Sequence, residues 1–197
     1  MTRFIKIISL SFLIKILIIN SAFTNVSEED FNSWLFSYKK YALKKGISQK
    51  TLDVTFKNVK YLEQVIRYDR KQPEFFEDTA TYVGKRANEA RAKKAEKLLN
   101  KNFSLFNKVE KAFNVEKEIL LSLWGIETNF GKHVGKMDII SSLATLSYDK
   151  RRKKFFSSQL LTLLKLIDKK LLDPNKLYGS WAGAYGNFQF MPSTIKA

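Results

Sequence analysis

The chain contains no cysteine among its 197 residues. This excludes disulfide bonds, thiolate catalysis, zinc ribbons and lipid attachment at an N-terminal cysteine. A single histidine, His133, leaves little material for a Ser-His-Asp triad or a histidine-based metal site, and we expect it in an exposed loop. With three prolines and eight glycines, most of the chain before residue 124 is predicted to be helical, including one long charged helix over residues 76–99.

The composition is that of a globular domain with an excess of positive charge. Hydrophobic residues make up 45% of the chain and aromatic residues 14%, which is enough to form one domain with a core. The formal net charge is +16, a surplus that suits a polyanionic partner such as nucleic acid, an anionic lipid surface or a cell-wall polymer. If the protein is exported, nucleic acid is the least suitable of these three partners.

Residues 1–22 have the pattern of a signal peptide. Arg3 and Lys6 precede an apolar run over residues 7–19, and Ala22 is a small residue suited to cleavage. Lys15 interrupts the run, which weakens the case for a permanent membrane-spanning helix, although an uncleaved anchor is the alternative. We therefore expect residues 23–197 to form one domain outside the cytoplasmic membrane.

A glutamate occupies a helix position where a hydrophobic residue is expected. Leu120, Leu123 and Trp124 follow helical spacing, and the next inward position is Glu127. With Asn114 as the predicted N-terminal cap and Gly131 as the predicted end, Glu127 would be buried near the C-terminus of the helix. Burial and the helix dipole both disfavour the ionised form, as a general acid requires. The alternative is an edge position paired with a lysine.

Residues 179–193, here called the glycine-rich segment, interleave glycine with aromatic and amide side chains. Gly183 and Gly186 allow the backbone to approach a ligand closely, while Trp181, Tyr185 and Phe188 offer flat faces for sugar rings. The segment lacks the Gly-Lys-Ser/Thr ending of a phosphate loop, and its serine is not in a Gly-x-Ser-x-Gly turn.

Four blocks in order resemble the lytic murein transglycosylase B family. They are residues 69–75 (DRKQPEF), 124–131 (WGIETNFG), 142–156 (SLATLSYDKRRKKFF) and 179–193 (GSWAGAYGNFQFMPS). The resemblance extends from about Phe31 to the last residue. It implies a mainly α fold, namely a lysozyme-like helical transglycosylase domain, and a location in the periplasm.

The resemblance assigns functional roles to six positions. Glu127 aligns with the lone catalytic acid of the family. The other five match residues that line the substrate cleft: Ser180, Gln189, Arg151, Arg152 and Tyr82. The alternative for each is structural, since the arginines can pair with Asp149 or glutamates and Gln189 can satisfy backbone groups. No metal site and no cofactor are predicted.

The implied reaction cleaves the β-1,4 bond between N-acetylmuramic acid and N-acetylglucosamine without water. Protonated Glu127 gives its proton to the glycosidic oxygen, and the acetamido group of the substrate stabilises the anomeric carbon, so a second carboxylate is not needed. Glu127 then takes the proton of the muramic acid C6 hydroxyl as a 1,6-anhydro ring closes. The implied partner is therefore the peptidoglycan glycan strand, with no nucleic acid.

Members of this family continue beyond the position of Ala197, so we expect a domain that is incomplete at its C-terminus. Cleft residues and any calcium loop expected there cannot be assigned. Two alternatives to the transglycosylase remain. One is a lysozyme-type hydrolase that uses the same Glu127, and the other is a peptidoglycan-binding protein without activity.

Overall fold

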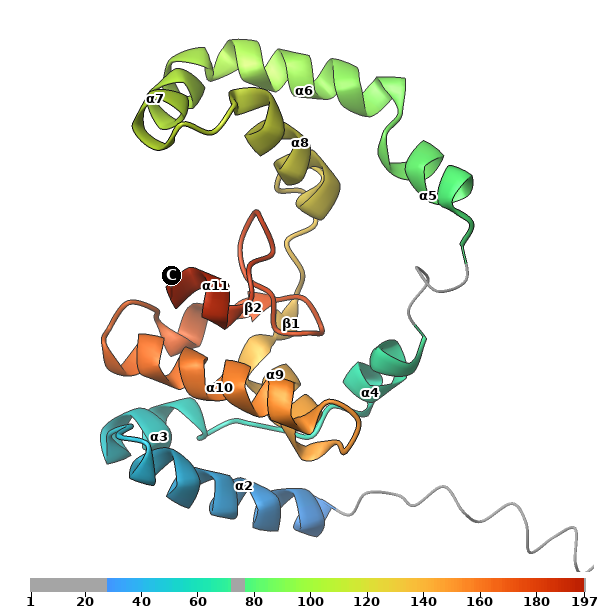
Figure 1. Ribbon diagram of the computed structural model, residues 1–197. Coiled ribbons are helices and arrows are strands. Elements are labelled where there is room, and N and C mark those ends of the chain that lie inside the picture. Colours follow the sequence, from blue (N-terminus) through green and yellow to red (C-terminus); the bar gives the residue numbers. More distant parts are fainter. Residues whose placement is uncertain (1–27, 72–76, 197) are drawn as a thin grey trace, which may run out of the picture.

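The computed structural model describes residues 28–71 and 77–196 and is mainly helical (Figure 1). The mainly α fold predicted from the sequence is confirmed. The predicted signal peptide, residues 1–22, lies outside the described residues. Within the described ranges, no helix combines the length and the hydropathy needed to cross a bilayer.

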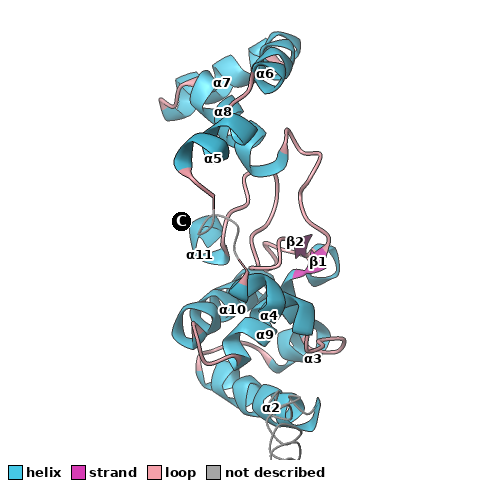
Figure 2. Cartoon of the chain, turned by 90° about the vertical axis from the view of Figure 1, so that its right-hand side faces the viewer, coloured by secondary structure: helices cyan, strands magenta, loops and turns pink. Residues whose placement is uncertain are grey.

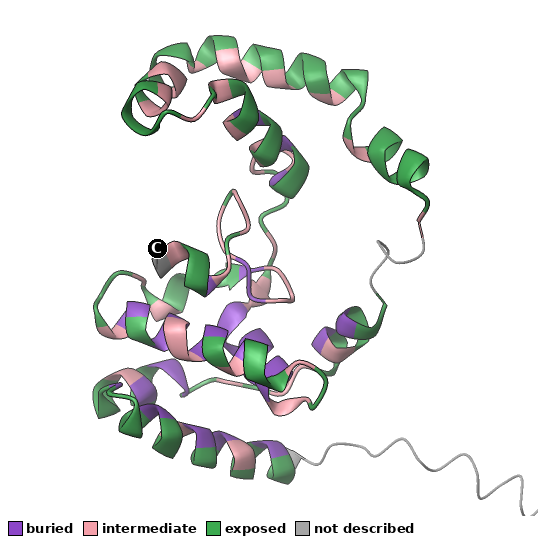
Figure 3. Ribbon diagram, viewed as in Figure 1, coloured by how far each residue is buried: buried purple, intermediate pink, exposed green. Residues whose placement is uncertain are grey.

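The larger part of the fold, here called the core lobe, is built around one buried helix. Helix α9 (Ile139–Tyr148) is buried at every position from Ile139 to Ser147, and the parts of it that are visible behind α10 in Figure 3 are purple. A helix that is buried on every side is stable only when its neighbours cover it. It contacts α2 (Glu28–Lys44), α4 (Glu63–Arg70) and α10 (Lys153–Asp168), while α3 (Gln49–Thr55) and α11 (Pro192–Lys196) pack on α10.

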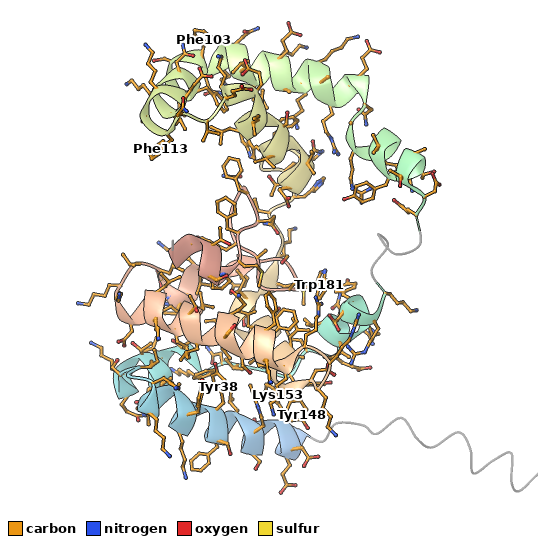
Figure 4. All side chains as sticks on the ribbon, viewed as in Figure 1. Tyr38, Phe103, Phe113, Tyr148, Lys153 and Trp181 are labelled. Carbon is orange, nitrogen blue, oxygen red and sulfur yellow. The ribbon has the colours of Figure 1, made fainter. Side chains whose placement is uncertain are left out.

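The remaining helices form a second part, here called the helical arm, which lies apart from the core lobe (Figure 2). It consists of α5 (Thr79–Arg86), α6 (Glu89–Lys101), α7 (Phe103–Phe113) and α8 (Lys117–Thr128). All of α5, α6 and α7 are described, and none of their residues is buried. Figure 4 shows Phe103 and Phe113 at the end of the arm formed by α7, where both are exposed.

The prediction of one long helix over residues 76–99 is wrong, because residues 87 and 88 separate two helices, α5 and α6. The Asn88 side chain accepts a hydrogen bond from the Arg91 N–H at 3.0 Å and so caps a new helix. Asparagine favours this cap over a position inside a helix, since its short side chain competes for backbone donors. Residues 103–113, which belong to the part of the chain predicted to be helical, form α7.

Two short strands bring the glycine-rich segment against the chain that leaves α8. Strand β1 (Met137–Asp138) pairs antiparallel with β2 (Tyr178–Gly179), with Met137 opposite Gly179. The approach is close: a Cβ atom on Gly135 would lie 2.1 Å from the Gly179 carbonyl oxygen. Glycine at position 135, where φ is +85°, is therefore required for this contact.

Candidate active site

Glu127 lies in the last turn of α8, as predicted, but it is exposed rather than buried. The buried positions of α8 are Leu121, Gly125 and Thr128, so the buried stripe runs beside the predicted one. Leu123 is 43% exposed. Among the described residues, the Glu127 side chain makes no hydrogen bond or ion pair, so the alternative of a lysine partner is not observed either.

Small residues explain why the buried stripe is displaced. A Cβ atom on Gly125 would lie only 2.8 Å from Cζ of the Phe130 ring, so this ring packs directly against the helix backbone. Hydrophobic periodicity gives glycine and threonine little weight as indicators of a buried position. Close packing nevertheless favours such small residues, because they let a neighbouring segment approach the helix. Glu127 therefore lacks the buried surroundings that were predicted for it.

Both ends of α8 differ from the prediction. Asn114 has a φ of 51° and ends α7, and α8 begins after Glu116 without a side-chain cap. The helix ends at Thr128 because Asn129 and Phe130 adopt left-handed backbone angles before Gly131 does. Left-handed geometry is unfavourable for an aromatic residue, so the surrounding contacts must stabilise this exit.

Asn187, in the glycine-rich segment, contacts the end of α8 from the core lobe side. Its Oδ1 accepts a hydrogen bond from Trp124 Nε1 at 3.2 Å, and its backbone oxygen lies 2.9 Å from the Thr128 hydroxyl. Trp124 and Thr128 are one turn apart on the same face of α8, and Glu127 directly precedes Thr128 in the chain. Two of the blocks singled out in the sequence are thus in direct contact.

Ser180 and Gln189 shape the backbone of the glycine-rich segment. The Ser180 hydroxyl accepts a hydrogen bond from the Ala184 N–H at 3.0 Å. The Gln189 amide donates to the backbone oxygens of Gly186 at 2.8 Å and Val134 at 3.2 Å. The alternative in which Gln189 satisfies backbone groups is therefore observed in this ligand-free structure.

Arg151 and Arg152 converge on Asp69, a residue that the sequence analysis did not single out. Asp69 is 1% exposed, and its carboxylate forms ion pairs with Arg70, Arg151 and Arg152. Its position in the first of the four blocks was the only available signal. An isolated aspartate in a charged stretch of sequence does not indicate burial.

Asp149 has a different role from the one expected for it. It pairs with Arg70 at 2.8 Å and accepts the Arg151 backbone N–H at 3.0 Å, instead of pairing with the side chains of the predicted arginines. The hydroxyl of Tyr61 has a raised pKa, first because it is partly buried and second because the negative charge of Asp149 is near. This charge cluster fixes α4 to the turn between α9 and α10.

Tyr82 and His133 are exposed side chains away from these contacts. Tyr82 lies on α5, where the guanidinium of Arg86 stacks 3.6 Å from its ring centre. Within the described part of the chain, no hydrogen bond or ring contact links Tyr82 to Glu127 or to the glycine-rich segment. His133 is exposed in the loop after α8, as predicted.

One pocket of about 340 Å³ lies between α6 and α8. Its walls include Ala92 and Ala95 from α6, and Gly125 and Ile126 from α8, with Arg91 at the α6 side. Ile126 immediately precedes Glu127 in the chain, but Glu127 itself does not line the pocket. In residues 28–71 and 77–196, no three acidic or histidine side chains are grouped in a way that would bind a metal ion.

Comparisons with known proteins agree on one family. Residues 30–197 match the model of the transglycosylase SLT domain. Over 91 residues the chain is 42% identical to membrane-bound lytic murein transglycosylase B of Escherichia coli K12, a stretch that covers 46% of this chain and 25% of that protein.

Solved structures give the same fold. The chain superposes on SltB3 from Pseudomonas aeruginosa, crystallised with NAG-NAM-pentapeptide, with a TM-score of 0.79 and 33% identity over 84% of this chain and 44% of that one. It superposes on soluble lytic transglycosylase SltB1 from the same organism with a TM-score of 0.72 and 28% identity over 82% of this chain and 55% of that one. The chain thus spans a quarter to about half of the length of these relatives.

Proposed function

Because the chain belongs to the transglycosylase SLT domain family, we propose that it is a peptidoglycan lytic transglycosylase. It cleaves the β-1,4 bond between N-acetylmuramic acid and N-acetylglucosamine and leaves 1,6-anhydromuramic acid ends. The observation that carries the proposal is the contact between the end of α8, which bears Glu127, and the glycine-rich segment through Asn187. This contact supports a site in which the helix turn that bears a single carboxylic acid meets the glycine-rich segment.

Glu127 acts as the acid and then as the base. Its side chain is exposed and has no partner among the described residues, so both carboxyl oxygens are available to a substrate. A glycan bound over this surface removes water from the carboxyl group, which favours its protonated form. The proton passes to the glycosidic oxygen, and the carboxylate then takes the proton of the C6 hydroxyl while that oxygen closes the anhydro ring.

The other predicted residues bind or orient the substrate. Ser180 and Gln189 maintain the shape of the glycine-rich segment, which faces the sugar. Arg151 and Arg152 are paired with Asp69 but remain 44% and 37% exposed, so their free N–H groups can bind carboxylates of the peptide that the glycan carries. Tyr82 offers a partly exposed ring. Relative SltB3 was crystallised with such a peptide-bearing fragment.

The proposal includes the organisation and location of the chain. Residues 1–22 form a signal peptide and residues 23–197 a catalytic domain that acts in the periplasm, with an uncleaved anchor as the alternative. The support is the basic and apolar pattern of the first 22 residues. The reaction uses no cofactor, because one carboxyl group and the acetamido group of the substrate suffice.

Digestion of purified peptidoglycan followed by mass spectrometry tests this function. The protein should release fragments with anhydro ends, each lighter by one water than the reducing ends that a hydrolase makes. Glu127→Gln should abolish release. Glu118→Gln is the matched control, because Glu118 lies on the same helix and its nearest cation, Lys117, is 3.5 Å away at the surface.

Two experimental results would contradict this proposal, and each would support a different function. Reducing ends from the wild-type protein, lost in Glu127→Gln, would show a lysozyme-type hydrolase. Binding to peptidoglycan with no product from either protein would show a binding protein without activity.

A further inference from the structure

Thr128 is a buried polar residue that directly follows Glu127. It is 1% exposed, and its hydroxyl has three neighbours within hydrogen-bonding distance. They are the backbone oxygen of Asn187 at 2.9 Å, the backbone N–H of Gly131 at 3.0 Å and the backbone oxygen of Trp124 at 3.2 Å. A buried hydroxyl with several partners fixes the relative position of the segments that supply them.

The hydroxyl has one proton and two lone pairs, which decides how it uses these neighbours. It accepts from the Gly131 N–H and donates to one carbonyl oxygen at a time, with the shorter distance to Asn187. It therefore joins three pieces of chain: the last turn of α8, the left-handed exit after it and the glycine-rich segment. Asn187 adds a second link through its side chain to Trp124 Nε1 at 3.2 Å.

The last turn of a helix needs such links, because its final carbonyl groups have no partner within the helix and its end frays. Glu127 lies in that turn, and its side chain makes no hydrogen bond or ion pair among the described residues. Its carboxyl group is therefore placed by its backbone alone. A productive acid must be positioned to within about half an ångström of the reacting oxygen.

From these contacts we infer that the Thr128 hydroxyl is the positioning group for Glu127, and that it acts by binding the last turn of α8 to the glycine-rich segment. The inference rests on the proposed function. It adds to that function a residue that does not touch the substrate and that sets the geometry of the acid. Asn187 is the partner through which the two parts of the site are aligned.

Three variants separate the hydroxyl from the shape of the side chain. Thr128→Val keeps the shape and removes the hydroxyl, and Thr128→Ser keeps the hydroxyl. The matched control is Thr55→Val in α3, because Thr55 is also buried but its hydroxyl has no hydrogen-bond partner within the described part of the chain.

We expect Thr128→Val to lower kcat by about 10- to 100-fold with KM changed by less than about 3-fold, since a misplaced catalytic group costs rate rather than binding. Thr128→Ser and Thr55→Val should keep kcat within about 3-fold of wild type. A role of the threonine methyl group in packing would not be rescued by serine.

The indole N–H resonance of Trp124 gives a readout that does not depend on activity. The chain has three tryptophans, so each indole resonance can be assigned by NMR. Thr128→Val should shift the Trp124 resonance, because Asn187 moves away from it, and should leave the resonances of Trp34 and Trp181 in place. All variants are checked by circular dichroism for helix content.

The results that overturn the inference differ from those that overturn the function. If Glu127→Gln is inactive and Thr128→Val has wild-type kcat, the positioning role is wrong while the function stands. If serine is no better than valine, the hydroxyl is not the cause. If the wild-type protein makes no anhydro ends, the proposed function fails. Independently of activity, an unshifted Trp124 resonance in Thr128→Val would refute the role of the Thr128 hydroxyl in joining α8 to Asn187.

Discussion

Replacement of Asp69 by asparagine should destabilise the core lobe more than any other single charge change that we consider. The carboxylate is 1% exposed and pairs with Arg70 at 2.5 Å, Arg151 at 3.0 Å and Arg152. Asp69→Asn keeps the shape and removes the charge. Three guanidinium groups would then face one another, and among the described residues Asp149 would be left to offset them through its pair with Arg70.

The magnitude follows from how far these arginines are solvated. Removing one partner of a fully buried ion pair costs about 3–5 kcal/mol, because the remaining charge stays buried and unpaired. Here the three arginine side chains are between 37% and 44% exposed and regain water when they separate. The cost should therefore be about 2–3 kcal/mol of unfolding free energy. For a chain of this size that is roughly 5–10 °C in Tm.

Urea unfolding followed by circular dichroism measures this cost, provided that the slope with denaturant is unchanged. Glu63→Gln on the same helix is the matched control, because its pair with Arg67 spans 3.4 Å and both side chains are mostly exposed. That change should cost less than about 0.5 kcal/mol. If Asp69→Asn costs no more than Glu63→Gln, the reasoning that burial makes this cluster important is refuted.

Two further predictions concern a close backbone contact and the response to acid. Gly135→Ala should unfold at a lower urea concentration than Gly46→Ala. Both positions have φ of +85°, but a Cβ atom at Gly46 has no neighbour within 4 Å, whereas a Cβ atom at Gly135 would lie 2.1 Å from the backbone oxygen of Gly179. Equal urea midpoints for the two variants would contradict the clash. Asp168 accepts hydrogen bonds from the Ser48 and Thr51 hydroxyls at 2.5 and 2.6 Å, which lower its pKa. A carboxyl pKa that folding lowers stabilises the fold above the unfolded value of about 3.9, and that stability is lost as the pH falls through the folded value. Asp168→Asn should therefore be less stable than wild type at pH 7 and approach it at pH 3, and an equal difference at both pH values would exclude the carboxylate as the cause.

The helical class, the family and the surface position of His133 could be predicted because they depend on local sequence. Apolar spacing, scarce proline and the four blocks do not require knowledge of which segments meet. The same local reasoning failed over residues 76–99, where helical composition extends across Asn88. The Asn88 side chain caps the start of α6 and so sets the boundary between the two helices, and hydrophobic periodicity does not detect a cap.

The site was predicted as a set of residues but not as an arrangement. The catalytic and binding roles of the six residues stay predictions until activity is measured. The predicted burial of Glu127 is wrong because the helix turns its small residues, Gly125 and Thr128, toward its neighbours. The sequence predicted no role for Asp69 or Asn187, because their importance comes from partners that are distant in sequence.

The sequence by itself determined the helical fold, the family and the identity of the single carboxylic acid in the second block, since these are written in spacing and composition. Only the tertiary structure decided which face of α8 is buried and which residues connect the acid to the glycine-rich segment. The physical reason is that burial and hydrogen bonding depend on how closely two backbones approach. Gly125, Thr128 and Asn187 set that approach across almost 60 residues of intervening chain, with Thr128 and Asn187 in direct contact.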